Sequence, residues 1–182
     1  LCFAGNLITF YLFFELLTLT SMPMVLHNGS RESVMAGLKY LFYSLCGAYL
    51  SLFGLYFIDS YGNTLTFSAG GVISAAAADG HGPVLLLAAM LMLIGFGVKA
   101  GMFPLHAWLP SAHPVAPAPA SAVLSAVIVK AGVLGIVRVV YYIFGVSFLR
   151  GSWVQSAWLI LALLTVFMGS MLAYREPVLK KR

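Results

Sequence analysis

Long apolar segments dominate this sequence and leave few folds open to it. Hydrophobic residues make up 62% of the 182 residues and charged residues only 8%, with a mean hydropathy of +0.99. Soluble domains carry about 25% charged residues, so we expect an integral membrane protein. Only α-helices and closed β-barrels satisfy every backbone group in hydrocarbon. The apolar runs reach the roughly 20 residues that a membrane-spanning helix needs, and they lack the alternation of barrel strands. These features predict an all-α, polytopic helix bundle.

Five membrane spans are predicted within a single transmembrane domain covering residues 1–182. We expect the spans at residues 3–26, 34–58, 83–103, 118–144 and 153–174, with the third continued by a broken segment at 104–116. This arrangement places Arg31, Arg175 and the terminal residues 180–182 (Lys-Lys-Arg) on one side of the membrane. Basic residues favour the cytoplasmic side, so the N-terminal end is predicted to be external and the C-terminal end cytoplasmic. Because the chain opens inside an apolar run without Met, we interpret it as an internal part of a longer protein.

Three ionisable residues lie deep within these apolar runs: Glu15, Lys99 and Lys130. Such groups cost roughly 3 kcal/mol each on insertion scales unless they face protein or water. Tyr11 and Thr18 share the helix face of Glu15, which indicates a narrow polar seam. A lysine can load and release a proton when a carboxylate approaches or withdraws. We therefore predict a proton relay in which Glu15 pairs with Lys99 and Lys130 is the next station. The alternative is that the charges only hold helices together.

A proline-rich stretch follows Lys99 and predicts an interruption of the third span. Pro104 removes the backbone donor for the carbonyl of Ala100 and crowds that carbonyl. Freed carbonyls within a membrane need water or a polar side chain, so we expect a hydrated cavity beside Lys99. His106, just beyond the break, is a possible further relay residue because histidine titrates near physiological pH. A capping role for His106 is equally consistent with the sequence.

Several other classes of site are not indicated. The sequence shows no Gly-rich nucleotide loop after a strand, no cysteine cluster for iron–sulfur and no third ligand to join His106 and His113 at a metal. We therefore expect no cofactor in this chain. The formal charge of +5 comes largely from the C-terminal cluster and the intramembrane lysines, so it does not predict a nucleic-acid partner.

One stretch, residues 97–132, carries a family resemblance. Its sequence GVKAGMFPLHAWLPSAHPVAPAPASAVLSAVIVKAG closely resembles the signature of proton-translocating antiporter-like subunits. Such subunits occur in respiratory complex I (NADH:quinone oxidoreductase), in Mrp-type Na⁺/H⁺ antiporters and in energy-converting hydrogenases. Residues 10–17, FYLFFELL, are similar to the family helix that bears a glutamate, and residues 179–182 resemble the start of the following helix.

The resemblance implies specific roles for the three ionisable residues. Glu15 matches the glutamate of the family's fifth helix, Lys99 the lysine of its broken seventh helix and Lys130 the lysine of its eighth. The chain would then supply helices five to nine of a fourteen-helix subunit, most of one of two inverted five-helix repeats. The family topology agrees with the orientation predicted from charge. Ser111 departs from the family, which commonly has Asp at this position, so a surface cap is expected to be lost.

The expected function follows from these residues and from the resemblance. We predict a proton-translocating, non-redox subunit of a redox-driven complex in the inner (cytoplasmic) membrane of a prokaryote, with other membrane subunits and the lipid bilayer as partners. An Mrp-type subunit that exchanges H⁺ for Na⁺ is the main alternative, because the same helices would serve both. A structural helix bundle is the more remote alternative.

Overall fold

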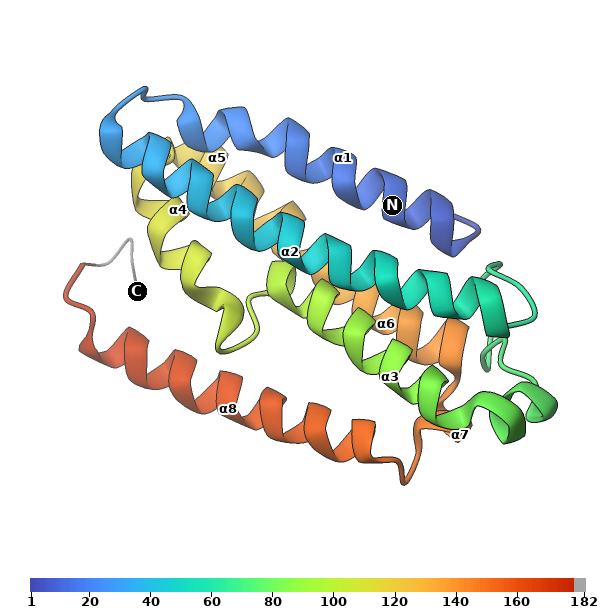
Figure 1. Cartoon of the computed structure of the whole chain (residues 1–182). Helices are drawn as coiled ribbons and strands as arrows, with labels where there is room; N and C mark the ends of the chain where they lie inside the picture. The colour runs from blue at the N-terminus through green and yellow to red at the C-terminus, as the bar shows by residue number, and fades with distance from the viewer. Residues whose placement is uncertain (179–182) are drawn as a thin grey trace.

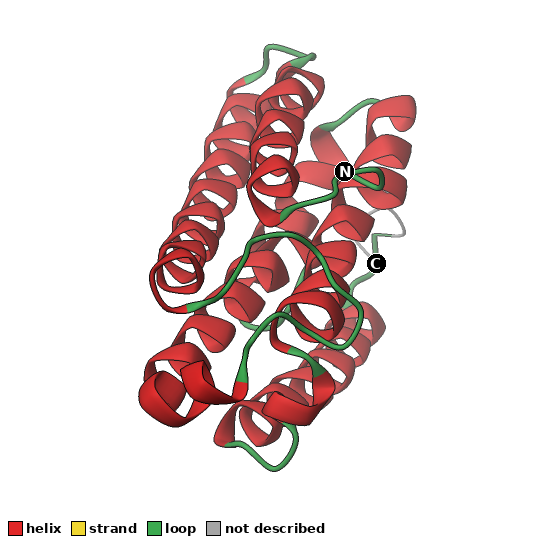
Figure 2. Cartoon of the chain, turned by 90° about the vertical axis from the view of Figure 1, so that its right-hand side faces the viewer, coloured by secondary structure: helices red, strands yellow, loops and turns green. Residues whose placement is uncertain are grey.

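The computed structural model describes residues 1–178, apart from the side chain of residue 75, and this part of the chain is built from helices. Figure 2 shows helices joined by loops, and among the described residues the only β-pairing is an isolated antiparallel bridge between Asn6 and Thr66. Five helical stretches are long and apolar enough to cross a membrane. The predicted all-α, polytopic bundle is therefore confirmed.

The first two spans form an antiparallel hairpin. Helix α1 is Leu7–Leu26 and helix α2 is Arg31–Tyr61. Asn6 Oδ1 accepts a hydrogen bond from the N–H of Thr9 at 2.7 Å, and Ser30 Oγ accepts one from the N–H of Ser33 at 3.1 Å. Each cap satisfies a backbone donor that the first turn of a helix leaves free. The short turn between Leu26 and Ser30 brings α2 back alongside α1 (Figure 1).

Helix α3, Ala75–Ala100, packs along α2 and begins earlier than the predicted start at Pro83. Ser74 caps the helix, accepting a hydrogen bond from the N–H of Ala77 at 3.2 Å. The residues before Pro83 therefore form a first helical segment, and a kink at His81, where φ is −130°, joins it to the rest of α3. Proline has no N–H to donate, and the kink accommodates this missing bond.

The third span is interrupted directly after α3. The chain turns and continues as the 3₁₀-helix η1, Leu105–Trp108, and helix α4, Leu109–Val115. Gly101 ends α3 in the left-handed conformation, with φ of +84°. Its N–H and that of Met102 bond to the carbonyls of Val98 and Gly97 at 3.2 and 2.9 Å, the pattern of a Schellman cap. The residue that stops the helix is thus Gly101, and Pro104 follows in the turn.

The fourth span is one long helix that includes two π-helical segments. It consists of α5 (Ala118–Val123), η2 (Leu124–Ile128), α6 (Val129–Arg138) and η3 (Val139–Phe144). At the end of α6, the guanidinium of Arg138 donates to the carbonyls of Ala4 and Cys2. A short helix, α7 (Val146–Leu149), leads to the fifth span, α8 (Trp153–Arg175). Helix α8 lies along the outside of the bundle (Figure 1), and only Val154 within it is buried.

Small residues let α3 lie close to its neighbours on two sides. A Cβ atom added to Gly95 of α3 would lie 2.4 Å from the carbonyl oxygen of Gly47 in α2. A Cβ atom added to Gly132 of α6 would lie 2.5 Å from the backbone nitrogen of Ala100. Close backbone approach through small residues is typical of helix packing in membranes. Helix α3 is therefore the central element of the bundle.

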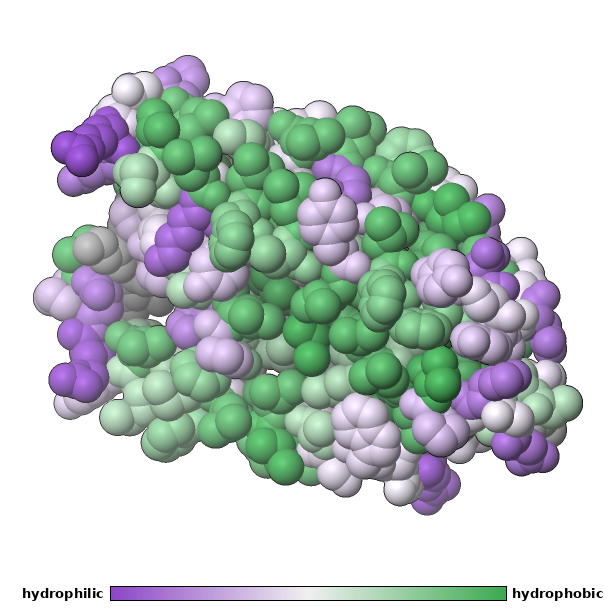
Figure 3. All heavy atoms as spheres, in the orientation of Figure 1, coloured by the Kyte–Doolittle hydropathy of each residue, from purple (hydrophilic) through white to green (hydrophobic). Residues whose placement is uncertain are grey.

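The surface of the bundle suits a lipid environment. Figure 3 shows hydrophobic residues over the middle of the visible face and hydrophilic residues at its two ends. The start of α2 with Arg31 and the end of α8 with Arg175 lie at the same end of the bundle (Figure 1). The remaining members of the predicted basic cluster, residues 180–182, lie outside the described residues. Together with its five spans, this apolar surface identifies the chain as an integral membrane protein.

Candidate functional site

Lys99 is enclosed in the last turn of α3, where its side chain is only 1% exposed. Its Nζ donates hydrogen bonds to the carbonyl oxygen of Phe14 at 2.9 Å and to Thr18 Oγ1 at 2.5 Å. The same Nζ lies 3.5 Å from the centroid of the Phe14 ring. The face of an aromatic ring attracts a desolvated cation by about 2 kcal/mol. Lys99 is thus bound by neutral groups of α1.

The packing of α1 against α3 creates this binding site. Phe14 and Thr18 lie one turn apart on the same face of α1. The Phe14 ring packs edge-on against Phe96 of α3, with 4.9 Å between ring centroids. Its carbonyl can accept the Lys99 hydrogen bond in addition to the helix bond, because a carbonyl oxygen has two lone pairs. The aromatic contact therefore positions the groups that hold the amine.

The helix break beside Lys99 is closed by a tryptophan. Trp108 of η1 is fully buried, and its Nε1 donates to the carbonyl of Val98 at 2.9 Å. Its ring lies against that of Tyr40, with 5.0 Å between centroids. The indole thus adds a second hydrogen bond to the Val98 carbonyl, which also accepts one from the N–H of Gly101. Lys99 also lies at the C-terminal end of α3, where the helix dipole favours a cation.

Glu15 lies near Lys99 but does not contact it. The Glu15 side chain is half-buried, and its Oε1 is buried without a hydrogen-bond partner. No hydrogen bond or ion pair joins the two residues in the part of the chain that the structure describes. Glu15 nevertheless lies on α1 between Phe14 and Thr18, the two residues that bind the Lys99 amine. The structure therefore brings the predicted pair into electrostatic range without forming a direct pair.

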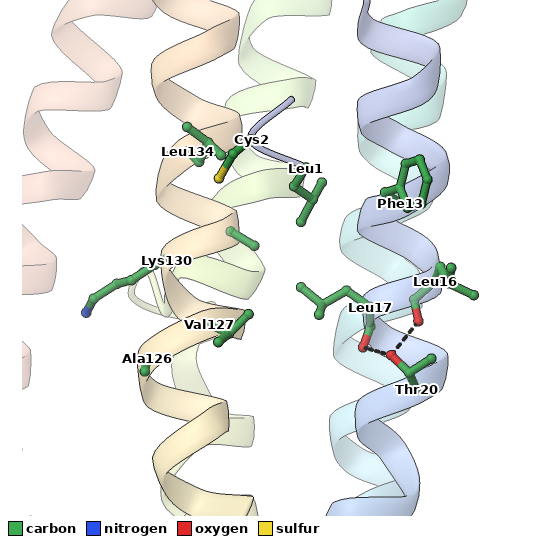
Figure 4. A pocket seen from close by; sticks show the side chains of 11 residues that line it. Leu1, Cys2, Phe13, Leu16, Leu17, Thr20, Ala126, Val127, Lys130 and Leu134 are labelled. Carbon is green, nitrogen blue, oxygen red and sulfur yellow. Dashed lines mark hydrogen bonds between the residues drawn. The ribbon is translucent and has the colours of Figure 1, made fainter. Parts of the chain in front are cut away.

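Lys130 has an exposed position at the start of α6. Figure 4 shows its amine directed away from Leu1 and Leu17, which lie across a groove between α1 and α6. This groove has a volume of about 690 Å³ and is lined mostly by apolar side chains. Within residues 1–178, the structure therefore does not bring the Lys130 amine into contact with Glu15 or Lys99.

His106 lies in η1 and makes no hydrogen bond through its buried Nδ1. Its ring stacks on Phe103, with 5.4 Å between centroids. His106 lines a second groove of about 590 Å³ together with His113 and Glu176. Within the described residues, no group of three His, Cys, Asp or Glu side chains could hold a metal ion. The Nδ1 atom of His106 therefore does not cap a helix end in this structure.

Ser111, which departs from the family pattern, still interacts with a cation. Lys39 of α2 donates to Ser111 Oγ at 3.0 Å, and this hydroxyl donates to the carbonyl of Ala107 at 3.1 Å. The serine therefore links α4 to α2, although it lacks the charge of an aspartate.

Three residues of the site could not be assigned from the sequence: Phe14, Trp108 and Tyr40. Phe14 precedes Glu15 in an aromatic run that shows no distinguishing period. Trp108 lies inside the stretch that resembles the family, but the sequence does not reveal which carbonyl it binds. Tyr40 had a weak signal, because Ser33 and Ser44 lie at helical spacing from it and all three are buried on one face of α2.

Comparison with known proteins places the chain in a family. Residues 4–182 match the family described as NADH:quinone oxidoreductase/Mrp antiporter, TM. Hydrogenase-4 component B of Escherichia coli is 37% identical over 135 residues, which cover 74% of this chain and 19% of that protein. NADH-quinone oxidoreductase subunit N of Moorella thermoacetica is 31% identical over 179 residues, which cover 98% of this chain and 37% of that protein.

A solved structure supports the same relationship. A chain of the Mrp complex from a Dietzia species superposes with a TM-score of 0.82 at 25% identity, covering 97% of this chain and 32% of that chain. This chain therefore spans between about a fifth and about two fifths of the length of these relatives. Because the family match extends over nearly every residue, the chain belongs to the NADH:quinone oxidoreductase/Mrp antiporter transmembrane family.

Proposed function

We propose that this chain is part of an antiporter-like subunit that moves protons across the membrane within a multi-subunit complex. The observation that carries this function is the environment of Lys99: a buried amine beside a helix break, bound by neutral groups and within electrostatic range of Glu15. A buried charge that serves stability alone is often replaceable by apolar residues without loss. Intramembrane ionisable residues instead mark ion pathways.

The groups around Lys99 suit both protonation states of its amine. The Thr18 hydroxyl can accept a hydrogen bond from the ammonium form and donate one to the neutral form. The Phe14 carbonyl can accept from either form. A direct Glu15 contact would strongly favour one state, whereas a nearby carboxylate can change the proton affinity of the amine by a small movement. Proton exchange between Glu15 and Lys99 is the first step of the proposed relay.

Lys130 is the next station in this relay. Gly132, two residues later, lies against the backbone of α3 at Ala100, so the helices that bear the two lysines are in contact. The Lys130 amine faces away from the described groove. Further helices of a longer subunit would supply its partner.

The relatives support two kinds of complex. The names hydrogenase-4 component B and NADH-quinone oxidoreductase subunit N favour a redox-driven complex, in which other subunits carry the redox cofactors. The similarity to the Mrp complex favours the alternative, exchange of H⁺ for Na⁺ by the same helices. In either case the partners are other membrane subunits. We assign the chain to a prokaryotic inner membrane, with the end that bears Arg31 and Arg175 in the cytoplasm.

Substitution of Lys99 by Met tests the proposed function. The change keeps an unbranched apolar stem and removes the titratable amine. In the complete subunit, assembled and reconstituted in proteoliposomes, we expect normal assembly and a fall in proton transfer of at least about tenfold. Glu15→Gln is expected to act in the same direction, and Cys46→Ser, at an exposed position of α2, serves as control.

Three outcomes separate the candidate functions. A structural bundle would lose assembly in Lys99→Met. An Mrp-type subunit would show proton transfer that requires Na⁺ in the opposite compartment, whereas a redox-driven subunit would pump without a Na⁺ gradient. Wild-type proton transfer by assembled Lys99→Met complexes would show that the role given to Lys99 is wrong.

A further inference from the structure

A cluster of buried hydroxyl groups lies between α1 and α2 beside the Lys99 site. The hydroxyl cluster consists of Ser21, Tyr40 and Ser44, whose side chains are 3%, 0% and 2% exposed. Ser21 Oγ lies 2.7 Å from the Tyr40 hydroxyl and donates to the carbonyl of Thr18 at 3.1 Å. Because Ser21 donates to Thr18, it accepts from Tyr40, and the lone pairs of the Tyr40 oxygen stay available. The cluster is thus connected to the residue that binds Lys99.

Ser44 lies at the depth of Glu15 in the bundle. Helices α1 and α2 are antiparallel, and Ser21 faces Tyr40. Ser44, four positions after Tyr40, therefore lies at the depth of Leu17, four positions before Ser21. Each is about 6 Å further along its helix. That depth falls between Glu15 and Thr18.

Two polar atoms at this depth are buried without hydrogen-bond partners: Glu15 Oε1 and Ser44 Oγ. A serine in a membrane helix commonly bonds to a carbonyl in the preceding turn, as Ser21 does. Ser44 makes no such bond. An unpaired buried polar atom is costly, and in native proteins such atoms are normally satisfied by protein groups or ordered water. The two atoms therefore indicate a site for a small ligand that both donates and accepts hydrogen bonds.

We propose that Ser44 and Tyr40 hold a water molecule against Glu15, and that this water passes protons between Glu15 and Lys99. An internal water needs two to four polar partners. Glu15 Oε1, the Ser44 hydroxyl and the Tyr40 oxygen supply three. In one direction of transfer, the Glu15 carboxyl gives a proton to the water while the water gives one to the neutral Lys99 amine. The products are a carboxylate, an ammonium and an unchanged water, so Ser44 and Tyr40 are positioning residues.

This role rests on the proposed proton-transfer function, and two conservative variants test it in the complete complex. Ser44→Ala removes one hydrogen-bond partner of the water and changes the side-chain volume little, so we expect equal assembly. Tyr40→Phe keeps the ring against Trp108. In proteoliposomes, each variant is expected to lower proton transfer by roughly tenfold or more. A purely structural hydroxyl would leave transfer unchanged.

Matched controls come from the same helix. Ser51 is equally buried and its Oγ is also unpartnered, but it lies about two turns beyond Ser44 against the Gly95 backbone. Tyr43 makes an edge contact with Phe42 and does not belong to the hydroxyl cluster. Ser51→Ala and Tyr43→Phe are therefore expected to transfer protons at the wild-type rate. Equal losses in Ser51→Ala and Ser44→Ala would overturn the inference.

A structural readout separates this inference from the proposed function. An electron cryo-microscopy map of the complex that resolves ordered waters should show one within hydrogen-bonding distance of Ser44 Oγ and Glu15, and Ser44→Ala should lack it. If Glu15→Gln blocks transfer but Ser44→Ala and Tyr40→Phe do not, the water site is wrong and the relay stands. If Glu15→Gln and Lys99→Met transfer protons normally, the relay fails whether or not the water is seen.

Discussion

Lys99 and Lys130 have the same local sequence but different surroundings. Each follows a run of apolar residues and is followed by Ala and Gly. Lys99 is buried, with hydrogen bonds and a ring contact from α1. Lys130 is exposed, and its amine faces away from α1 (Figure 4). Two lysines that look equivalent in sequence therefore differ in how their charge is stabilised.

The glycine after each lysine accounts for part of this difference. Gly101 adopts a left-handed conformation and ends α3, so Lys99 lies in a final helical turn. Gly132 continues the helix of α6 and lets the backbone of α3 approach. The same Lys-Ala-Gly sequence thus ends one helix and forms a packing contact in the other. The decisive factor is the neighbouring helix rather than the tripeptide.

The largest effect is expected from enlarging Gly132. In Gly132→Leu the new side chain would meet the backbone of α3, which cannot move as a flexible side chain can. Overpacking of this kind should destabilise the complete subunit by about 3 kcal/mol or more, measured as the free energy of unfolding in detergent. Val133→Leu, at an exposed neighbouring position, is the control. Equal stability of the two variants would contradict the close contact beside Lys99.

Truncation of the two lysines compares them directly. Lys99→Ala removes a fully packed side chain and leaves a cavity, so it should cost about 2–3 kcal/mol. Lys130→Ala removes an exposed side chain and should change stability by less than about 0.5 kcal/mol. Thermal and chemical unfolding of the 182-residue chain in detergent can measure both. Equal costs would show that the two lysines are not distinguished by burial.

Removal of the Thr18 hydroxyl should have a smaller effect. Thr18→Val keeps the shape of the side chain but loses the acceptor of the Lys99 hydrogen bond. A hydrogen bond to a charged group contributes about 1.5–3 kcal/mol, and the Phe14 carbonyl remains as a partner, so we expect a loss of about 1.5 kcal/mol. Thr18→Ser should restore most of it. Thr20→Val, at an exposed site on the same helix, serves as the reference. A loss that Thr18→Ser fails to restore would point to packing instead.

A smaller loss than that of Thr18→Val is expected at Gly101. Gly101→Ala places a Cβ atom in the left-handed region, which should cost about 1 kcal/mol. Gly169→Ala, in α8 with open space around it, should instead be neutral or stabilising by up to about 1 kcal/mol, because glycine is unfavourable within a helix. Comparison of the two unfolding free energies checks the sign. A stabilising Gly101→Ala would show that α3 does not end in this conformation.

Much of the fold was predictable because the membrane restricts backbone structure. Apolar runs of sufficient length predict helices, and the proline-rich stretch after Lys99 predicts the interruption. The beginning of α3 was harder to predict, because Pro83 looks like a helix start while the Ser74 cap and the kink at His81 extend the helix backwards. Local caps and kinks can override the signal of a single proline.

The candidate site was predictable only in part. Glu15 and Lys99 were recognisable as ionisable residues in apolar surroundings, and the structure brings them near each other. The groups that bind Lys99 were not recognisable, because Phe14 lies in a helix that is apolar on nearly every side. In lipid the outer face of a helix is as hydrophobic as the inner one, so apolar periodicity does not reveal the packed face.

The sequence by itself determined that this protein is a helical membrane protein of the NADH:quinone oxidoreductase/Mrp antiporter transmembrane family, with rare charges inside its spans. Those properties depend on composition, run length and a local signature. Only the tertiary structure decided that Lys99 is bound by neutral groups of α1, that Glu15 stays out of contact with it, and that Lys130 faces outward. These properties depend on which helices pack side by side, and that choice rests on close contacts among residues far apart in the chain.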